Sequence, residues 1–383
     1  MEQLINITSA VSWNLFSFII LLSIIVFVHE MGHFLVARFY KVKCEVFSVG
    51  FGPELFGFND SYDTRWKFCI IPLGGYVKMF GQGESTDPTS FNNEHVDLTE
   101  EQKSQSFEFK PLYQRALIVF AGPAINFILA VLLYFILNIY GVGQLKPIVG
   151  SVQDNMPAAI SGIEVGDKII SINGESIESF SDLPRIINYT SYDVLEVSIL
   201  RGNSVIYKAI IPEMVSDITP AGKEISRKKL GIGPDYESRI IKRELNPIIA
   251  LGNAIEETIS ISQQILIFLA QVIKGEIDWR DAFGGPGKIG KYAGLSASAG
   301  LVPFLTLIAL ISINLGIVNL LPIPLLDGGH LLFYALEAIL RKPVPEIIQE
   351  WFNRFGLVFL MGLMIFLISN DVIDGSFTSW GLK

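Results

Sequence analysis

Four long apolar stretches dominate the hydrophobic pattern of the chain. They run from about Val11 to Ala37, from Ala116 to Tyr140, from Leu301 to Leu321 and from Phe355 to Ser369, where the flanks can lengthen the last. About 20 apolar residues in a helix cross the hydrocarbon core of a bilayer. The pattern therefore predicts a polytopic α-helical membrane protein with four transmembrane helices. A weaker stretch, Ile259 to Ile273, contains three glutamines and indicates an amphipathic or interfacial helix.

Composition supports this class. Half of the residues are apolar and 17% are charged, which suits a membrane protein with a sizeable water-exposed part. The net charge of −9, without a block of Lys or Arg, gives no reason to expect a nucleic-acid partner. Cys44 and Cys69 are too few for a disulfide scaffold. No basic segment precedes the first apolar stretch, so we expect a retained span and not a cleaved signal peptide.

Basic residues indicate the orientation of the chain in the membrane. They lie in short connections: Arg38, Lys41 and Lys43 after the first stretch, Lys110 and Arg115 before the second, and Arg341 and Lys342 between the third and fourth. The positive-inside rule places such connections in the cytoplasm. We therefore expect the N-terminus and the long segment from 141 to about 300 on the opposite side.

The segments between the spans carry other patterns. Residues 44–79 alternate short apolar runs with glycine-rich turns, which predicts β-hairpins. Residues 82–106 are polar and acidic, and we interpret them as a mobile loop. Residues 146–214 are typical of a compact α/β or β-rich module, with a hairpin signal at Asn173 and Gly174.

These patterns divide the chain into seven parts. They are 1–45 (first transmembrane helix), 46–112 (the β-hairpin region and mobile loop), 113–143 (second transmembrane helix), 144–235 (the β-rich module), 236–298 (amphipathic or interfacial helical segment), 299–330 (third transmembrane helix with the Leu-Asp-Gly motif) and 331–383 (loop, fourth transmembrane helix and tail).

The motif His29-Glu30-Met31-Gly32-His33 closes the first apolar stretch. Histidines four residues apart lie on one face of a helix, where both can bind one cation. The pattern is typical of zinc hydrolases, in which the glutamate takes a proton from a water activated by the metal. The alternative is a wet helix end that follows the span. The apolar residues from Phe34 to Ala37 weigh against it, since the span continues past the motif.

A catalytic zinc ion needs a third protein ligand. The candidate is Asp327, which follows a break in the third span at Pro322 and Pro324. A helix-capping role for Asp327 is the alternative. His330 is a rival ligand that we rank lower, and His95 has the setting of a surface residue.

Two further amide-bearing segments suggest support for this site. Asn319, in an apolar helix, would either donate to the oxyanion of the reaction or hydrogen-bond a neighbouring helix. The segment from Gly122 to Asn126 indicates close helix packing with a polar contact to the site.

Together these motifs resemble the site-2 protease family of intramembrane zinc metalloproteases, in particular the bacterial regulator of sigma-E protease type. The matching segments are His29 to His33, Gly50 to Pro53, Ile71 to Met79, Ala121 to Asn126 and Asn319 to Gly329. The resemblance implies one Zn²⁺ ion held by His29, His33 and Asp327, with Glu30 as general base and Asn319 in support. It also implies a multi-pass protein of the bacterial inner membrane, with its active site near the cytoplasmic side.

The resemblance further implies how substrate is held. The substrate-binding residues would be Gly50, Phe51 and Gly52 in a re-entrant β-loop and Ile71, Pro72, Leu73, Gly74, Gly75 and Tyr76 in an edge strand. An open strand edge can hold an unwound peptide. Substrates would be single-span membrane proteins already trimmed outside, such as anti-sigma factors or signal-peptide remnants.

The module at 144–235 is similar to a PDZ domain of the circularly permuted bacterial kind, present here in one copy on the periplasmic side. It would bind peptide C-termini, with residues 147–152 as the binding loop. A non-enzymatic membrane adaptor that uses this module and a structural metal site is the alternative function. We place it lower because Glu30 and both histidines are intact. A metal-ion transporter would need more carboxylates within the membrane.

Overall fold

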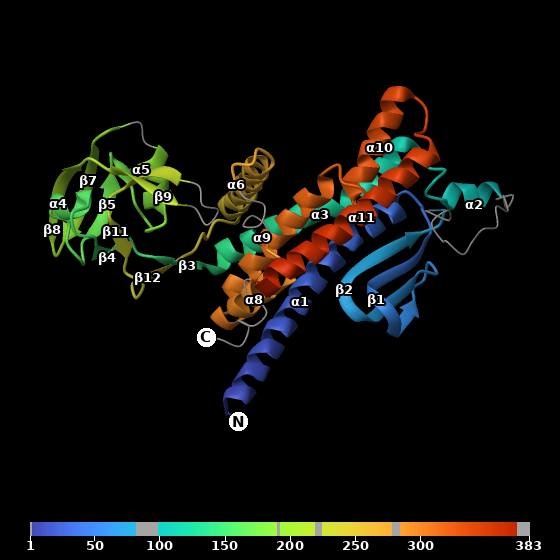
Figure 1. Ribbon diagram of the computed structural model, residues 1–383, viewed down its shortest axis with the longest axis horizontal. Helices are drawn as coiled ribbons and strands as arrows, with labels where there is room; N and C mark the ends of the chain where they lie inside the picture. The colour runs from blue at the N-terminus through green and yellow to red at the C-terminus, as the bar shows by residue number, and fades with distance from the viewer. Residues whose placement is uncertain (1, 82–98, 190–191, 219–223, 278–283, 374–383) are drawn as a thin grey trace. The chain divides into compact units, whose positions relative to one another are not determined.

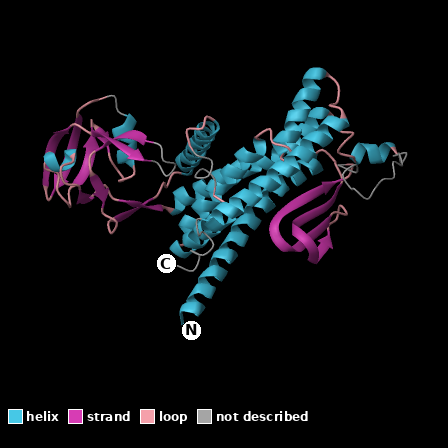
Figure 2. Cartoon of the chain, viewed as in Figure 1, coloured by secondary structure: helices cyan, strands magenta, loops and turns pink. Residues whose placement is uncertain are grey.

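The computed structural model describes residues 2–81, 99–189, 192–218, 224–277 and 284–373. The chain divides into two compact units, and each is described by itself. The first comprises residues 1–135, 251–267 and 283–383, and the second comprises residues 136–250 and 268–282. Figures 1 and 2 show helices as the main component of the first unit and strands as the main component of the second.

The first unit contains the helices long and apolar enough to cross a membrane. In the described part of the chain there are four such spans: Val11–Phe39 within α1 (Glu2–Phe39), α3 (Leu112–Tyr140), α9 (Leu301–Leu320) and Ile347–Ile373 within α11 (Glu346–Ile373). The predicted set of four spans is thus confirmed by length and composition. The fourth is longer than its apolar run, because helix continues into the flanking polar residues. Its most apolar window is only 11% buried, as expected for a helix surrounded by lipid.

Further helices fill the rest of this part of the sequence. They are α2 (Glu100–Gln105), α6 (Pro247–Ile273), α8 (Pro286–Ala299) and α10 (Asp327–Leu340). The segment after residue 330 is therefore helical to Leu340, where a loop was expected. Helix α2 lies within the expected mobile loop and is fixed by a capping box, in which Thr99 and Gln102 satisfy each other's backbone N–H groups. His95 lies outside the described residues.

Two long strands, β1 (Cys44–Asn59) and β2 (Arg65–Met79), form the predicted hairpin region. Residues 46–49 pair with 75–78 on one side and with 65–68 on the other, and residues 54–59 also pair with 65–69. The ribbon therefore folds back on itself as a layer ordered 54–59, 65–69, 46–49, 75–79. Residues 75–79 lie at one border of this layer, as an edge strand. Figure 1 shows the curl of both strands.

The edge strand is held against the first membrane helix by a small apolar core. Phe47 is fully buried in β1, and its ring contacts those of Phe34 and Phe27 of α1 and is stacked on Trp66 of β2. Such aromatic contacts fix the approach of ribbon and helix. The result is a β-layer anchored beside the turn of α1 that carries the histidines.

The second unit has its own core. Its strands are β3 (Val142–Leu145), β4 (Val149–Val152), β5 (Lys168–Ile172), β6 (Glu175–Ser176), β7 (Leu195–Arg201), β8 (Ser204–Ile210), β9 (Glu213–Ile218), β10 (Glu224–Lys229), β11 (Ile232–Pro234) and β12 (Arg239–Lys242), with helices α4 (Pro157–Ile160) and α5 (Asp182–Tyr189). The main sheet has the order β6-β5-β7-β8, and its apolar face packs on both helices. The predicted turn is present: Asn173 and Gly174 both have positive φ and join β5 to β6.

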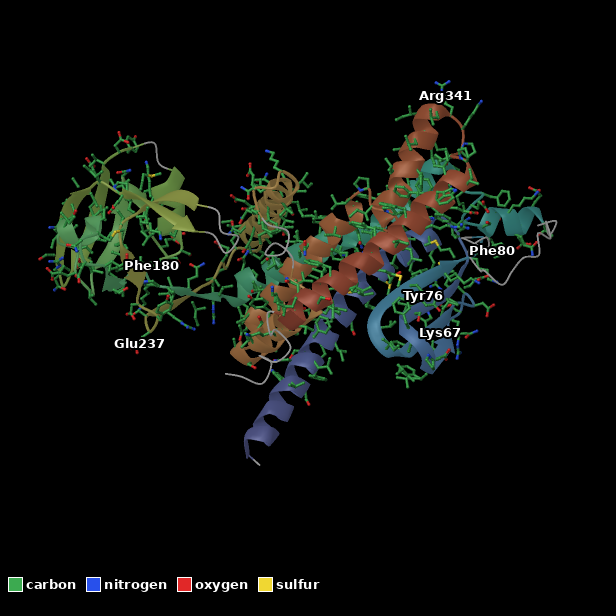
Figure 3. The ribbon with its side chains drawn as sticks, in the orientation of Figure 1. Lys67, Tyr76, Phe80, Phe180, Glu237 and Arg341 are labelled. Carbon is green, nitrogen blue, oxygen red and sulfur yellow. The ribbon has the colours of Figure 1, made fainter. Side chains whose placement is uncertain are left out.

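Two pairings define the borders of this unit. Strand β4 pairs with β11, so most of the expected peptide-binding loop is a strand within the fold. Strand β3 pairs with β12. The chain segment that leads into the module and the one that leads out of it therefore form one two-stranded ribbon. Phe180 and Glu237, labelled in Figure 3, lie in the module and in the segment just before β12.

Candidate metal centre

The last turns of the first membrane helix present two imidazoles to one point. His29 and His33 are buried on the same face of α1, with their Nε2 atoms 3.3 Å apart. The Asp327 carboxylate completes the group: Oδ2 is 3.2 Å from Nε2 of His29, and Oδ1 is 3.5 Å from Nε2 of His33. One potential ligand atom from each residue lies within 4.8 Å of the other two. The structure thus brings Asp327 to two histidines that lie nearly 300 positions earlier in the sequence.

Asp327 reaches this position because the chain breaks sharply after the third span. Helix α9 ends at Leu320, the next residues include Pro322 and Pro324, and α10 begins at Asp327. A side chain on Gly328 would lie 2.1 Å from the carbonyl oxygen of Leu321, so only glycine allows the backbone to fold back so tightly. Irregular backbone at this depth is tolerated where it lines a cavity.

The donor set fits a metal ion. Oδ2 of Asp327 is buried and lies 3.2 Å from Nε2 of His29, but no contact among the described residues gives it a hydrogen bond of good geometry. A buried carboxylate oxygen without a well-formed hydrogen bond is costly. Two imidazole nitrogens and one carboxylate oxygen are the ligands of catalytic zinc sites, which leave one position open. The three side chains are therefore better suited to bind a divalent cation than to hydrogen-bond one another.

A cavity of about 250 Å³ opens beside this group. Its walls include His29, Glu30 and His33 of α1, Asn319 of α9, Asp327 and His330 of α10, and Tyr76, Val77 and Met79 of β2. Figure 3 labels Tyr76 on the strand that borders the helices. Glu30 is not one of the three grouped residues, and a methyl group added to Gly75 of β2 would lie 3.3 Å from its Cγ. The acid next to the candidate ligands thus lies directly beside the edge strand.

Comparison with known proteins decides the family. Residues 17–363 match peptidase family M50. The chain belongs to this family. A protein of Brucella suis that is provisionally named a zinc metalloprotease is 39% identical over 93% of this chain and 94% of its own length. Similarly named proteins of Mesorhizobium japonicum and Campylobacter jejuni are 38% and 34% identical, over 94% and 92% of this chain and 98% and 92% of their own lengths.

Membership of M50 makes this chain a metalloprotease, and the four apolar helices fit a multi-pass membrane protein of that family. The resemblance to site-2 proteases drawn from the sequence motifs is therefore confirmed. In the described part of the chain, His29, His33 and Asp327 form the group of His, Cys, Asp or Glu side chains that could hold a metal ion.

Helix α3 forms the back wall of the metal centre. His33 Nδ1 lies 2.9 Å from the carbonyl oxygen of Ile118, and the Asn126 amide lies 3.1 Å from Nδ1 of His29. The sequence indicated a polar contact from the segment 122–126 but not the carbonyl of Ile118, because a backbone acceptor has no signature in the sequence. Asn319 lies 3.3 Å from Nε2 of His29, so this amide contacts a histidine of another helix.

The remaining predicted residues differ in their distance from the cavity. Tyr76 lines it, and a side chain on Gly75 would lie 3.3 Å from Cγ of Glu30. Phe51 pairs with Ile71 across the ribbon and stacks on Tyr76 at 6.2 Å between ring centroids. Gly50, Gly52 and Gly74 have positive φ and shape the bend of the ribbon. Pro72 and Leu73 belong to β2, and their side chains lie outside the description.

His330, the rival ligand, and Cys44, a buried thiol, take no part in the group. His330 lines the cavity but is not one of the three clustered residues. Burial raises the pKa of the Cys44 thiol to about 12, despite the nearby Arg38 guanidinium, which lowers it. Cys44 therefore stays protonated at neutral pH and is a poor metal ligand.

Gly122 gives the first testable prediction. It lies where α3 crosses behind the histidines, and an added methyl group would lie 2.2 Å from Nε2 of His33 and 2.9 Å from Cε1 of His29. We expect Gly122→Ala to displace an imidazole and to lower zinc content and peptidase activity together. Gly362→Ala in α11 is the matched control, because nothing lies within 4 Å of its added methyl group. Metal analysis of both purified variants checks this, and a Gly122→Ala variant with full zinc content contradicts it.

Proposed function

We propose that this chain is an intramembrane zinc endopeptidase, which cleaves the membrane spans of single-span proteins already trimmed on the outer side. Its M50 relatives are named as zinc metalloproteases. The proposed ligands are His29, His33 and Asp327, and the proposed general base is Glu30. The proposed substrates are anti-sigma factors or signal-peptide remnants in a bacterial inner membrane, with the cut near the cytoplasmic side.

The observation that carries this proposal is that Glu30 and the edge strand line the same cavity, where a methyl group added to Gly75 would lie 3.3 Å from Cγ of Glu30. In an antiparallel ladder, alternate residues direct their backbone groups to opposite sides. Val77 pairs with Phe47 on one side of the edge strand, and it lines the cavity that Glu30 also lines. Gly75 has the same parity as Val77. The outward groups of this edge are therefore directed at the residues that would carry out the chemistry.

Such an edge answers a physical problem of intramembrane proteolysis. A helical substrate has its peptide carbonyls hydrogen-bonded within the helix, where attack is hindered. Added as a strand beside residues 75–79, the same segment exchanges those bonds for bonds to β2. Glu30, which lines the cavity together with Val77, would then lie beside the extended peptide.

The catalytic roles follow from these positions. Zinc, when bound, supplies a Lewis acid that polarises the peptide carbonyl and makes water a better nucleophile. Glu30 takes a proton from the attacking water as the oxygen bonds to the carbonyl carbon, and delivers it to the amide nitrogen as the C–N bond breaks. Asn319, beside His29, is positioned to donate a hydrogen bond to the developing oxyanion.

The β-rich module is proposed to act as a PDZ-like domain on the periplasmic side that binds the exposed C-termini of trimmed proteins. Its self-contained core supports a role as a separate binding module. We do not retain the adaptor alternative, because the chain belongs to a peptidase family and keeps Glu30 with both histidines.

A reporter span tests the proposal. The purified enzyme is reconstituted with a single-span protein without an outer domain, and the cut is located by mass spectrometry. We expect a cut inside the span. Two glycines in place of leucines at the cut lower the cost of unwinding by about 2 kcal/mol, which corresponds to roughly 30-fold in rate.

The same two glycines in the half of the span away from the cut are the control, and they should change the rate little. A reporter that keeps a folded outer domain should be cut more slowly than the trimmed one. Cuts only outside the span, or equal rates for both glycine placements, would contradict an enzyme that unwinds its substrate at the edge strand.

A further inference from the structure

Asn126 is fully buried in the middle of α3, beside the metal centre. One end of its amide lies 3.1 Å from Nδ1 of His29, and the other end, Oδ1, has no hydrogen-bond partner among the described residues. An amide atom left unpaired in a buried site costs about 1–3 kcal/mol. A buried amide that accepts this cost needs a reason, and its contact with a candidate ligand supplies one.

The position of His29 determines which nitrogen can face a cation. Its Nε2 lies 3.2 Å from Asp327 and 3.3 Å from Nε2 of His33, whereas Nδ1 faces α3. A neutral imidazole that binds metal through Nε2 carries its proton on Nδ1. Nδ1–H is then a donor, and it requires an acceptor on α3.

The two orientations of an asparagine amide have the same shape and are distinguished by their hydrogen bonds. With Nδ2 against His29, two donors would oppose each other once Nε2 binds metal. With Oδ1 there, the amide accepts the Nδ1–H. Oδ1 as placed has no partner among the described residues, so no second hydrogen bond fixes that orientation, and the metal-binding role of Nε2 decides between the two.

His33 shows the same arrangement with no ambiguity. Its Nδ1 lies 2.9 Å from the carbonyl oxygen of Ile118, which can only accept, so Nδ1 carries the proton and Nε2 is free for metal. Ile118 and Asn126 are eight residues apart, and therefore lie about two turns apart on one face of α3. The hydroxyl of Ser312 on α9 donates to the backbone carbonyl of Asn126 at 2.9 Å and fixes that turn in place.

We propose that Asn126 is a positioning residue of the metal centre, whose Oδ1 accepts the Nδ1–H of His29 and so holds the ring with Nε2 toward zinc. Helix α3 thus sets the tautomer of both histidines, one through a backbone carbonyl and one through a side chain. The inference rests on the proposed role of His29 as a ligand. Groups that hold ligating histidines in this way contribute 10- to 100-fold to metal affinity in other proteins.

Zinc affinity, measured by competition with a chromogenic chelator on the full-length chain in detergent, tests this role without any need for cleavage. Asn126→Leu removes the acceptor, and we expect zinc to bind 10- to 100-fold more weakly. Asn126→Asp keeps an acceptor of the same size and cannot donate. We expect this variant to bind zinc as well as the wild type or more tightly.

Either of two results would overturn the proposal. Wild-type zinc affinity in Asn126→Leu would show that the amide does not position His29. A loss in Asn126→Asp equal to that in Asn126→Leu would show that the amide donates to His29. If Asn126→Leu has no thermal transition in zinc-free buffer, Asn126→Asp alone decides, because it preserves the volume of the side chain.

Two controls separate this role from others. Asn138→Leu changes the same residue type on the same helix, at a position where the amide donates to the carbonyl of Ala250, and it should leave zinc affinity unchanged. His29→Ala should lose zinc far more severely than Asn126→Leu. If His29→Ala keeps zinc, the proposed ligand set fails, and that outcome is distinct from a failure of Asn126 alone.

Discussion

Glu30→Gln is expected to abolish cleavage of a reporter span while zinc stays bound. Glutamine has the shape of glutamate and can keep its place in the cavity wall beside β2. It cannot take a proton from water, and general acid–base groups contribute about 10²- to 10⁴-fold to rate. We expect a loss in turnover of that size, with one zinc per chain by elemental analysis and an unchanged melting temperature.

Glu45→Gln is the matched control, since Glu45 lies on β1 and pairs with Lys78 at a partly exposed site. Exposed ion pairs contribute little, so this variant should cleave like the wild type. Turnover at the wild-type rate in Glu30→Gln would assign the base to another residue. Loss of both zinc and turnover would show that Glu30 is needed to hold the metal site together and not only as a base.

The elements that could be predicted from the sequence were those with a strong periodic or apolar pattern. A span needs about 20 apolar residues, so α3 and α9 were located nearly to their ends, and α1 was located at its end but not at its start, because the helix begins at Glu2, before the apolar stretch. Helix α11 was underestimated, because Gln349 and Glu350 interrupt the apolar run at its start. The motif at residues 29–33 was readable because four residues make one helical turn, and Asp327 was readable because prolines broke the apolar span before it.

The remaining features depend on contacts that leave no local pattern. The ribbon folds so that residues 46–49 gain partners on both sides, which strand periodicity alone does not specify. The acceptor for His33 is the backbone carbonyl of Ile118, and any residue at that position supplies one. Gly122 was a visible signal, since glycine beside Pro123 in an apolar helix indicates a close approach, but its neighbour could not be named.

Asp327→Ala is expected to cost the enzyme both its zinc and its activity. The substitution removes the only anionic member of the three-residue group, and two neutral imidazoles alone do not make a catalytic zinc site. We expect zinc affinity to fall by more than the roughly 10- to 100-fold that loss of a group behind a ligand causes. Bound metal stabilises the folded state in proportion to the logarithm of its concentration over the dissociation constant. The zinc-induced rise in melting temperature should therefore disappear in this variant.

Two substitutions on the same helix isolate the effect of Asp327. Glu337→Gln changes another acid of α10. Glu337 forms an ion pair with Arg115 at 2.7 Å and is not a member of the cluster, so this variant should keep zinc. His330→Ala changes the other candidate ligand, which lines the cavity without joining the group, and should also keep zinc. If His330→Ala loses zinc and Asp327→Ala keeps it, the third ligand is His330. The sharp fold at Gly328 would then have some purpose other than bringing Asp327 to the metal. The buried Oδ2, which contacts His29 without a well-formed hydrogen bond, would be left without an explanation.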